Sequence, residues 1–338
     1  MADNILVFDE GTTSTRAIVF SADGRELAVC QEELTQYYPQ PGWVEHDAGE
    51  IWAKSLACAR RAIEQAGGVD TIAAIGITNQ RETVVAWDRS TGEPLTRAIV
   101  WQDRRSAELC EILKEAGREP EIQAATGLLL DPYFSATKIR WMHDHDEQVR
   151  NTPGNRLAFG TIDSWLAYKL SGGVHITDAS NASRTMLLRL DGAQFDENVG
   201  MWFGVSTSML PQVVDTHGHL AETQADLFGR VIPITAMIGD QQAATIGQGC
   251  LAPGETKATF GTGAFVLTNK GQDLPRSDNR LLGTVLMQQA GERTYAIEGS
   301  VFVAGSLVQW LRDSLGLIEQ AGDTEAMARA VADNAGVV

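Results

Sequence analysis

The sequence predicts an α/β protein of two domains, and three observations support this fold class. The chain has 338 residues, of which 43% are hydrophobic and 21% charged, so it is long enough for more than one hydrophobic core. Its opening predicts three consecutive strands joined by turns, unlike the βαβ unit that opens a dinucleotide-binding fold. The strand–turn–strand pattern of this opening returns after residue 251, which predicts a second domain that begins in a similar way.

The opening hairpin is predicted from two apolar runs, at residues 5–8 and 17–20, which flank a polar segment at residues 9–16. A turn at residues 22–24 then leads into a third strand over residues 25–34. The polar segment contains one glycine, several hydroxyl side chains and an arginine. An ordinary hairpin with a Gly/Thr/Ser-rich turn and a phosphate-binding turn are both compatible with this stretch taken alone.

A helix and a buried strand follow the opening sheet. Asp47 predicts the N-cap of the helix, and Glu50 three positions later predicts a capping box. The side chains expected to pack on the sheet are Ile51, Ser55, Ala59, Ala62 and Ile63. Residues 72–78 are continuously apolar, which predicts a strand buried on both faces. Four polar residues at 79–82 end that strand, where ligands collect in open α/β sheets.

The rest of the chain alternates between strand and helix signals. Further strands are predicted at residues 83–87, 99–101, 232–238, 256–260 and 264–267, and helices at 106–170 with a loop at 131–133, at 243–247 and at 301–315. The mixed signals of residues 177–211 give no assignment. With a linker at residues 251–254, we expect a first domain over 1–250 and the start of a second over 251–338. This second domain is expected to be incomplete and to expose an apolar edge.

Composition and missing motifs exclude several functions. The net charge is −17 without a basic cluster, and the apolar runs are far shorter than a membrane span, so we expect neither nucleic acid nor membrane as a partner. The N-terminus lacks signal-peptide features and the four cysteines are scattered, as in a reduced cytoplasmic protein. His–x–His pairs at 143–145 and 217–219 lack a third ligand nearby, and no serine-hydrolase, P-loop or dinucleotide motif is present.

The remaining polar residues fit phosphoryl transfer, which needs positioning and charge neutralisation more than covalent chemistry. Asp9, at the end of a strand, could hold a hydrated Mg²⁺. The side chains that could donate hydrogen bonds to phosphate are Thr12, Thr13, Ser14, Arg16 and Thr262. Asp240 lies between a strand end and a helix start, where it could accept a proton from an attacking hydroxyl; an N-cap without chemistry is the alternative.

A small polyol is the acceptor that the other polar and aromatic residues suggest. Arg81 and Glu82 pair a donor with an acceptor at a strand end, although a solvated surface ion pair is the plainer interpretation. The aromatic side chains that could cover the C–H face of a polyol are Trp101, Tyr133 and Phe265. A pocket whose polar groups are all paired by the substrate would reject analogues that lack a hydroxyl.

Taken together, these segments resemble the glycerol kinases of the FGGY carbohydrate kinase family, which have the two-domain actin-like (ribonuclease H-like) ATPase fold. The matching segments are residues 9–16 (DEGTTSTR), 41–47 (PGWVEHD), 75–82 (IGITNQRE), 99–105 (IVWQDRR), 126–134 (TGLLLDPYF), 177–186 (TDASNASRTM), 239–244 (GDQQAA) and 260–265 (FGTGAF). They run through nearly the whole chain in the order of the family.

The resemblance implies a reaction in which ATP and glycerol give ADP and sn-glycerol 3-phosphate, with Mg²⁺ assisted by Asp9 and with the two domains closing over the substrates. It implies a glycerol site formed by Arg81, Glu82, Trp101, Tyr133, Asp240, Gln241 and Phe265. Asp240 is the implied general base. The turn after Asp9 is implied to bind phosphates, and Thr262, Gly305 and Gln309 to lie on the nucleotide side. We expect the full-length protein to be cytoplasmic and a homo-oligomer, either a dimer or a tetramer.

Three departures from the family pattern define alternatives. Glu10 stands where the family usually has glutamine, so we expect a second acid beside the bound phosphates. Residues 227–230 do not match the loop that binds fructose 1,6-bisphosphate in some members, and Asp226 takes roughly the place of the histidine phosphorylated in others. The family also continues beyond residue 338, with a Gly-rich adenine-binding segment. A polyol-binding fragment without turnover, and an FGGY kinase for another polyol or sugar, are therefore the alternative functions.

Overall fold

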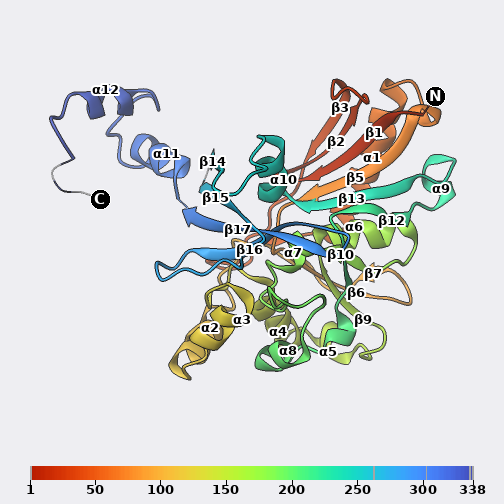
Figure 1. Ribbon diagram of the computed structural model, residues 1–338, viewed down its shortest axis with the longest axis horizontal. Coiled ribbons are helices and arrows are strands. Elements are labelled where there is room, and N and C mark those ends of the chain that lie inside the picture. Colours follow the sequence, from red (N-terminus) through yellow and green to blue (C-terminus); the bar gives the residue numbers. More distant parts are fainter. Residues whose placement is uncertain (1, 262, 302, 335, 337–338) are drawn as a thin grey trace.

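The computed structural model describes residues 2–261, 263–301, 303–334 and 336, and contains two principal sheets (Figure 1). The central sheet has the strand order β12-β13-β5-β1-β2-β3, and the second has the order β14-β15-β17-β16. The strands of the central sheet are β1 (Asn4–Glu10), β2 (Ser14–Phe20), β3 (Glu26–Glu33), β5 (Ile72–Asn79), β12 (His217–Glu222) and β13 (Pro233–Gly239). The predicted opening of three antiparallel strands is confirmed, because β1, β2 and β3 pair in that order.

The register of three parallel strands places the polar strand ends side by side. Strand β5 pairs in parallel with β1 on one side and with β13 on the other. Asn79 at the end of β5 faces Glu10 of β1 and Gly239 of β13. Asp9 and Asp240, which are far apart in the sequence, therefore emerge at the same edge of the sheet. This is the carboxyl edge, where the sequence predicted a ligand.

Helices α1 (Ala48–Gln65) and α6 (Ile162–Ser171) bury the core of the central sheet. Asp47 caps α1 as predicted, since its Oδ1 accepts hydrogen bonds from the backbone N–H groups of Gly49 and Glu50. The reciprocal half of the capping box is replaced, because the carboxylate of Glu50 accepts hydrogen bonds from Thr35 and Lys54 instead. The helix is therefore tied to the end of β3 as well as packed on the sheet.

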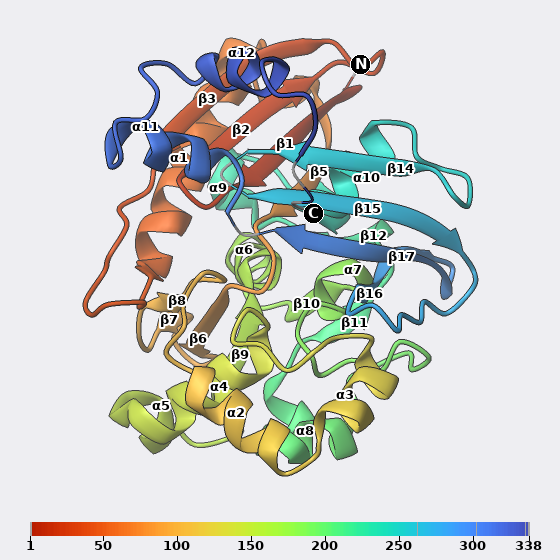
Figure 2. The same ribbon diagram turned by 90° about the vertical axis from the view of Figure 1, so that its left-hand side faces the viewer.

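A smaller sheet and a group of helices form the end of the molecule opposite β1–β3 (Figures 1 and 2). The sheet contains β4 (Glu45–His46), β8 (Ala98–Ile99), β6 (Val84–Asp88), β7 (Glu93–Pro94) and β9 (Leu157–Thr161). The helices are α2 (Ala107–Glu115), α3 (Glu119–Thr126), α4 (Ser135–His145), α5 (Glu147–Asn151) and α8 (Glu197–Phe203). The prediction of helix throughout residues 106–170 was wrong at β9. Every residue of β9 is buried, so the strand lacks the alternation that identifies a half-exposed strand.

The unassigned segment and its surroundings contain β10 (Ile176–Asp178), α7 (Ala179–Ala182), β11 (Gln212–Val214), α9 (Ala225–Phe228) and α10 (Asp240–Gly247). Asp178 caps α7 by accepting hydrogen bonds from the backbone N–H groups of Ser180 and Asn181. The side chains of Asn181 and Asn79 then exchange two hydrogen bonds, at 3.0 and 3.1 Å. Through this pair α7 is attached to the end of β5, directly behind the predicted site.

The second sheet is made of β14 (Thr256–Phe260), β15 (Ala264–Gly271), β16 (Leu282–Gln289) and β17 (Glu292–Val301), and is followed by α11 (Gly305–Asp313) and α12 (Asp323–Arg329). Both helices project away from the body of the molecule (Figure 1). The predicted helix start at residue 301 was wrong, because β17 continues to that residue. Phe260, Leu307 and Trp310 are exposed, so this part of the chain presents the apolar surface that the sequence predicted. Among the described residues, no helix combines the length and apolar character needed to cross a membrane.

Candidate functional site

The turn between β1 and β2 is held in place by its neighbours. The backbone N–H of Gly11 donates to the carbonyl of Ser14 at 3.0 Å, which closes the turn. Two glutamine side chains brace it from outside: Gln80 donates to the carbonyl of Gly11 at 2.9 Å, and Gln36 donates to the carbonyl of Thr12 at 2.9 Å. These hydrogen bonds from the rest of the chain fix the backbone of the turn.

Asp9 and Arg16 face each other across the base of this turn. Arg16 Nη2 lies 2.5 Å from Asp9 Oδ2, and 20% of the Asp9 side chain remains exposed. Burial raises the pKa of Asp9, while the charge and hydrogen bond of Arg16 act in the opposite direction. No group of three or more His, Cys, Asp or Glu side chains within the described residues could hold a metal ion. Asp9, although paired with Arg16, is a single carboxylate of the kind that fits Mg²⁺, which keeps several waters and shares its remaining ligands with phosphates.

The side chain of Glu10 points into the core and not toward the turn, where a second acid beside bound phosphates was expected. Because side chains alternate along β1, Glu10 is on the same face as Phe8 and is completely buried under α1. Ser55 Oγ lies 2.7 Å from Glu10 Oε2, 2.7 Å from the carbonyl of Ile51 and 3.0 Å from Thr15 Oγ1. Burial raises the pKa of Glu10 to about 8. Glu10 is therefore mainly protonated at neutral pH, and it adds little negative charge near the turn.

Arg81 is the centre of the substrate-side cluster and is buried. Its Nη1 and Nη2 lie 2.6 and 3.4 Å from the two carboxylate oxygens of Glu298, on β17 of the second sheet. Nη2 also donates to the hydroxyl of Tyr133 at 3.2 Å. On the opposite edge of the guanidinium, Nε lies 3.4 Å from Asp240 Oδ1 and 3.8 Å from Glu82 Oε1. The surface ion pair that was the plainer interpretation of Arg81 and Glu82 is excluded by their burial.

Glu82 is fixed by both its side chain and its backbone. Arg184, which follows α7 and is also buried, donates from Nε to Glu82 Oε1 at 2.6 Å and from Nη2 to Glu298 Oε1 at 2.9 Å. The backbone of Glu82 has a φ of 62°, in the left-handed region, and its carbonyl accepts a hydrogen bond from Ser135 Oγ at 3.0 Å. A strained residue held by several partners is a common feature of functional sites.

Asp240 begins α10, at the carboxyl end of β13. The Asp240 side chain is half-buried, with 39% of its surface exposed. Burial raises the pKa of Asp240, whereas the charge of Arg81 lowers it. Gln241 Nε2 lies 3.3 Å from Asp240 Oδ2, and Lys257 of β14 donates to Gln241 Oε1 at 2.7 Å. Gly239 permits this arrangement, because a Cβ at that position would come within 2.8 Å of the Arg81 side chain.

The predicted aromatic residues form one wall beside this cluster. The ring centroids of Trp101 and Tyr133 are 5.7 Å apart, and those of Trp101 and Phe265 are 6.3 Å apart. The indole N–H of Trp101 donates to Thr12 Oγ1 at 2.9 Å, which joins the wall to the phosphate-binding turn. A cavity of about 490 Å³ opens beside the wall and is lined by Trp101, Gln102, Arg104, Asp131 and Tyr133. The seven residues predicted for the acceptor site are thus brought together.

The nucleotide-side predictions are only partly placed. Thr262 lies outside the described residues. Its neighbour Gly261 accepts a hydrogen bond from the backbone N–H of Gly305 at 2.8 Å, so the start of α11 adjoins the second turn. Gln309 is one turn further along α11 and is exposed. Thr13 and Arg16 are exposed as well, while Thr12 and Ser14 are half-buried, so the first turn presents donors to solvent.

Three residues of the site were missed by the sequence reasoning: Arg184, Lys257 and Glu298. Arg184 lies within one of the segments that carry the family resemblance, but it received no role. Lys257 lies on the strand that leads into the second turn, and its positive charge near that turn could have marked it as a site residue. Glu298 follows the apolar run of β17, and an acid placed in a buried strand is the signal that could have identified it.

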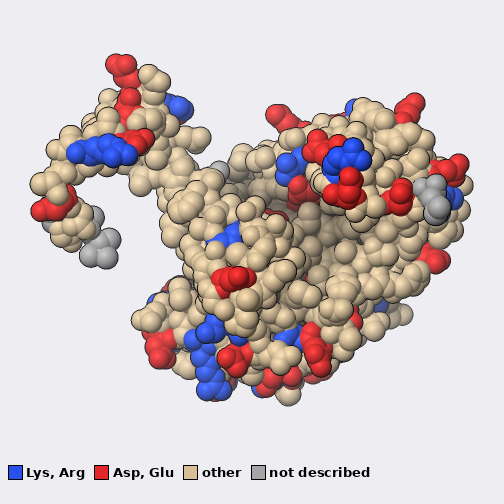
Figure 3. Space-filling model, turned by 45° about the horizontal axis from the view of Figure 1, so that its top comes forward, with Lys and Arg blue, Asp and Glu red and all other residues tan. Residues whose placement is uncertain are grey.

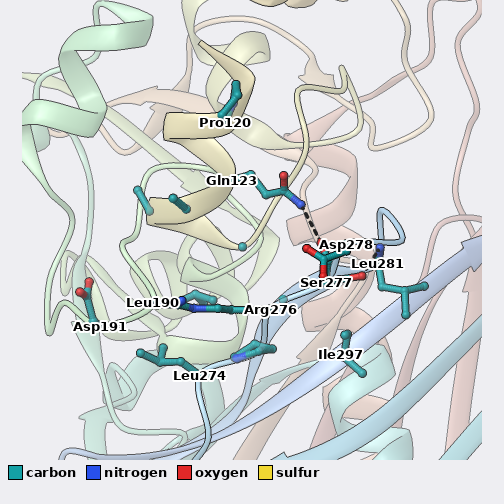
Figure 4. Close-up of a pocket in the computed structure, with 15 residues that line it drawn as sticks. Pro120, Gln123, Leu190, Asp191, Leu274, Arg276, Ser277, Asp278, Leu281 and Ile297 are labelled. Carbon is teal, nitrogen blue, oxygen red and sulfur yellow. Dashed lines mark hydrogen bonds between the residues drawn. The ribbon is translucent and has the colours of Figure 1, made fainter. Parts of the chain in front are cut away.

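A second cavity, of about 380 Å³, lies away from these residues. It separates α3 from the loop that joins β15 to β16, and in Figure 4 Gln123 of α3 points toward the segment that carries Ser277 and Asp278. None of its lining residues was predicted to take part in the reaction, and Arg81 and Asp240 do not line it. Figure 3 shows acidic and basic side chains interspersed over one face of the molecule, without a basic patch there.

Comparisons with known proteins agree with this geometry. Residues 4–247 match the N-terminal domain of the FGGY family of carbohydrate kinases, and residues 256–338 match the C-terminal domain of the same family. A glycerol kinase from Rhodospirillum rubrum is 53% identical over 335 residues, which is 98% of this chain and 68% of that protein. A glycerol kinase from Aromatoleum aromaticum is 52% identical over 337 residues, 99% of this chain and 68% of that protein.

Solved structures show the same fold. The crystal structure of Plasmodium falciparum glycerol kinase with ADP superposes with a TM-score of 0.91 at 34% identity, covering 98% of this chain and 67% of that one. A xylulose kinase from Rhodospirillum rubrum superposes with a TM-score of 0.86 at 24% identity, covering 97% of this chain and 67% of that one, and supports the fold alone. The chain spans about two thirds of the length of the relatives that it matches.

Proposed function

Because this chain belongs to the FGGY family of carbohydrate kinases, we propose that it catalyses the ATP-dependent phosphorylation of glycerol to sn-glycerol 3-phosphate. The observation that carries the proposal is the convergence of Arg81, Asp240 and the Trp101 wall at one edge of the central sheet, beside a braced phosphate-binding turn.

The acceptor site is proposed to bind glycerol through a small set of paired groups. Arg81 supplies N–H donors and Glu82 a carboxylate acceptor, and both side chains are held by buried partners. Trp101, Tyr133 and Phe265 would cover the C–H face of the polyol. A substrate hydroxyl that binds here pairs all of these groups. An analogue that lacks the hydroxyl leaves one of them unpaired and therefore binds more weakly, which gives selectivity for glycerol.

Asp240 is proposed as the general base, supported by Gln241. Its carboxylate accepts the proton of the attacking glycerol hydroxyl; the glycerol oxygen forms a bond to the γ-phosphorus, and the bond from that phosphorus to the ADP oxygen breaks. The proton then resides on Asp240 and the electron pair of the broken bond on ADP. Burial raises the pKa of Asp240, which makes it a stronger base than an exposed aspartate.

The phosphate side is proposed to use the first turn. Thr12, Thr13, Ser14 and Arg16 would donate hydrogen bonds to phosphate oxygens, and Thr262, Gly305 and Gln309 would contact the nucleotide from the second domain. Asp9 would hold Mg²⁺, which neutralises phosphate charge when it is bound. The cytoplasmic location, the homo-oligomeric state and the domain division at residue 250 remain predictions.

Calorimetry with glycerol, followed by an assay of ADP release, tests this function. We expect glycerol to bind and its phosphorylation to release ADP, with larger sugars much weaker. Binding of glycerol without ADP release would identify a polyol-binding fragment. The observation that favours this alternative is that the chain covers about two thirds of the length of its relatives. Preference for a larger polyol or sugar would identify another FGGY kinase, and the absence of any binding would contradict the proposal.

A further inference from the structure

Glu298 brings a buried negative charge from the second sheet into the acceptor site of the first domain. Its carboxylate is completely buried and contacts two arginines, Arg81 at 2.6 Å and Arg184 at 2.9 Å. Ser300 on the same strand donates a further hydrogen bond at 2.7 Å. These cations hold the pKa of Glu298 near 2, so it is ionised at every pH at which the protein works.

The two edges of the Arg81 guanidinium have different partners. The Nη1 and Nη2 edge meets Glu298 in a nearly bidentate pair, with distances of 2.6 and 3.4 Å. The Nε atom faces Asp240 at a longer distance of 3.4 Å. A guanidinium that is held on one side by a short charged pair is less free to approach a second carboxylate. The position of Glu298 therefore limits how strongly Arg81 neutralises Asp240.

The charged groups that act on Asp240 come from three segments. Arg81 follows β5 and lowers the pKa of Asp240, while Glu298 on β17 raises it. Lys257 on β14 interacts with Asp240 and reaches its neighbour Gln241, which belongs to α10 with Asp240 itself. Two buried charges of opposite sign, Lys257 and Glu298, thus approach Asp240 from the second sheet.

We propose that Glu298 is a positioning residue that holds Arg81 on the polyol side of the site and limits its approach to Asp240. The proposal deepens the proposed function and rests on it. When the second sheet carries Glu298 into place, Arg81 is fixed for the polyol and Asp240 remains free to accept a proton.

A purely structural role for Glu298 makes a different prediction. Buried ion pairs are poor sources of stability, because desolvation costs about as much as the attraction gains. Removal of a charge that only fills the core would affect unfolding, and its direct effect on the pKa of Asp240 would be the same with or without Arg81. The dependence of the Asp240 shift on Arg81 therefore distinguishes a positioning residue from a structural one.

The test is an NMR titration of protein labelled with ¹³C-aspartate, in which the Asp240 carboxyl resonance is assigned by its loss in Asp240→Asn. In Glu298→Gln the midpoint for Asp240 is expected at lower pH than in the wild type, because the released Arg81 moves toward Asp240. Calorimetry of the same variant should show glycerol affinity reduced about tenfold, as one partner of a charge-assisted hydrogen bond is lost. The matched control is Glu292→Gln, an exposed acid on the same strand, which should change neither measurement.

Two further variants complete the experiment. In an Arg81→Gln background, Glu298→Gln should shift the Asp240 midpoint less than it does alone, because the effect passes through Arg81. Where Glu298→Gln does not fold, Glu298→Asp keeps the negative charge but moves it away from Arg81. A smaller downward shift of the Asp240 midpoint is then expected. An unchanged Asp240 midpoint in the folded variants, or an equal shift in the presence and absence of Arg81, would overturn the inference. If wild-type protein binds no glycerol, the proposed function fails separately, and the Asp240 midpoint still decides the role of Glu298.

Discussion

The two strand–turn–strand motifs have similar sequences but very different surroundings. The first turn, after β1, is braced by Gln80, Gln36 and the indole of Trp101, and it lies over a core in which Phe8 is completely buried. The second motif, β14 and β15, is joined to α11 through a backbone hydrogen bond at Gly261. Phe260, which ends β14, is 79% exposed.

This difference shows that a repeated motif does not by itself determine a preorganised site. The side chains that brace the first turn come from the segments that follow β5, β3 and β8, and none of these lies within the hairpin. The acceptor site repeats the pattern, because Arg81 and Asp240 depend on neighbours from other elements. We therefore expect substitutions on the first side to have large effects, and comparable substitutions on the second side to have small ones.

The largest expected effect is on the base at the braced edge. Asp240→Asn should lower turnover by about 10²–10⁴-fold, since a general base contributes a factor of that order, while glycerol still binds. A coupled assay of ADP release and calorimetry with glycerol provide the two measurements. The exposed acid in Asp226→Asn serves as the control, and near-normal turnover of Asp240→Asn would mean that another group is the base.

A matched pair of phenylalanines tests the comparison directly. Phe8→Ala should lower the free energy of unfolding by about 3–5 kcal/mol, because it creates a cavity in the core. Phe260→Ala should change it by less than about 0.5 kcal/mol, because the ring is already in contact with solvent. Both values follow from denaturant unfolding of the variants. Equal losses for the two would show that the second motif is covered in solution.

Glu10, in the first hairpin, is expected to make the stability of the protein depend on pH. The folded protein keeps a proton on Glu10 up to a pH of about 8, whereas the unfolded chain releases it near 4.5. Between these values the free energy of unfolding should fall as pH rises, by up to about 1.4 kcal/mol per pH unit. Glu10→Gln should remove this fall, so the difference in the free energy of unfolding between the variant and the wild type should grow in favour of the variant toward pH 8. The turnover of the variant should be equal to that of the wild type, or its ATP affinity improved.

Thermal unfolding from pH 4.5 to 8.5 measures the effect of Glu10. The control is Glu33→Gln, an exposed acid at the end of β3, which should follow the wild type at each pH. A constant difference between Glu10→Gln and the wild type across this range would contradict the assignment of a protonated Glu10. A large loss of turnover would contradict the expectation about activity.

The smallest expected effect concerns the hydrogen bond between Trp101 and Thr12, which joins the aromatic wall to the first turn. Trp101→Phe removes the N–H that donates to Thr12 Oγ1 but keeps an aromatic face for the polyol. One such hydrogen bond contributes about 1 kcal/mol, so we expect a several-fold increase in the KM for ATP. Steady-state kinetics measure it, and Trp202→Phe on α8 is the control. An unchanged KM for ATP would show that Thr12 needs no brace.

The comparison also explains which features could be predicted from the sequence. Asp9, Arg81 and Asp240 stand where apolar strands end, so their meeting follows from a parallel sheet alone. Strand β9 has no polar alternation and could not be separated from a helix by pattern. The role of Glu298 depends on its contacts with Arg81 and Arg184, which lie far away in the sequence. No local sequence pattern predicts such contacts. The burial of Glu10 was not predicted, although alternation along β1, which places Glu10 on the same face as Phe8, could have indicated it.

The position of β13 has a consequence for how the protein folds. Strands β1, β2 and β3 are consecutive and can pair soon after they are synthesised, whereas β5 must wait for β13, which begins only at Pro233. Until then one edge of a strand rich in isoleucine remains unpaired. Pairings between distant segments form slowly, and open edges of this kind attract other chains. We therefore expect a nascent chain that ends before β13 to be prone to aggregation, and the completion of β13 to be the step that ends that risk.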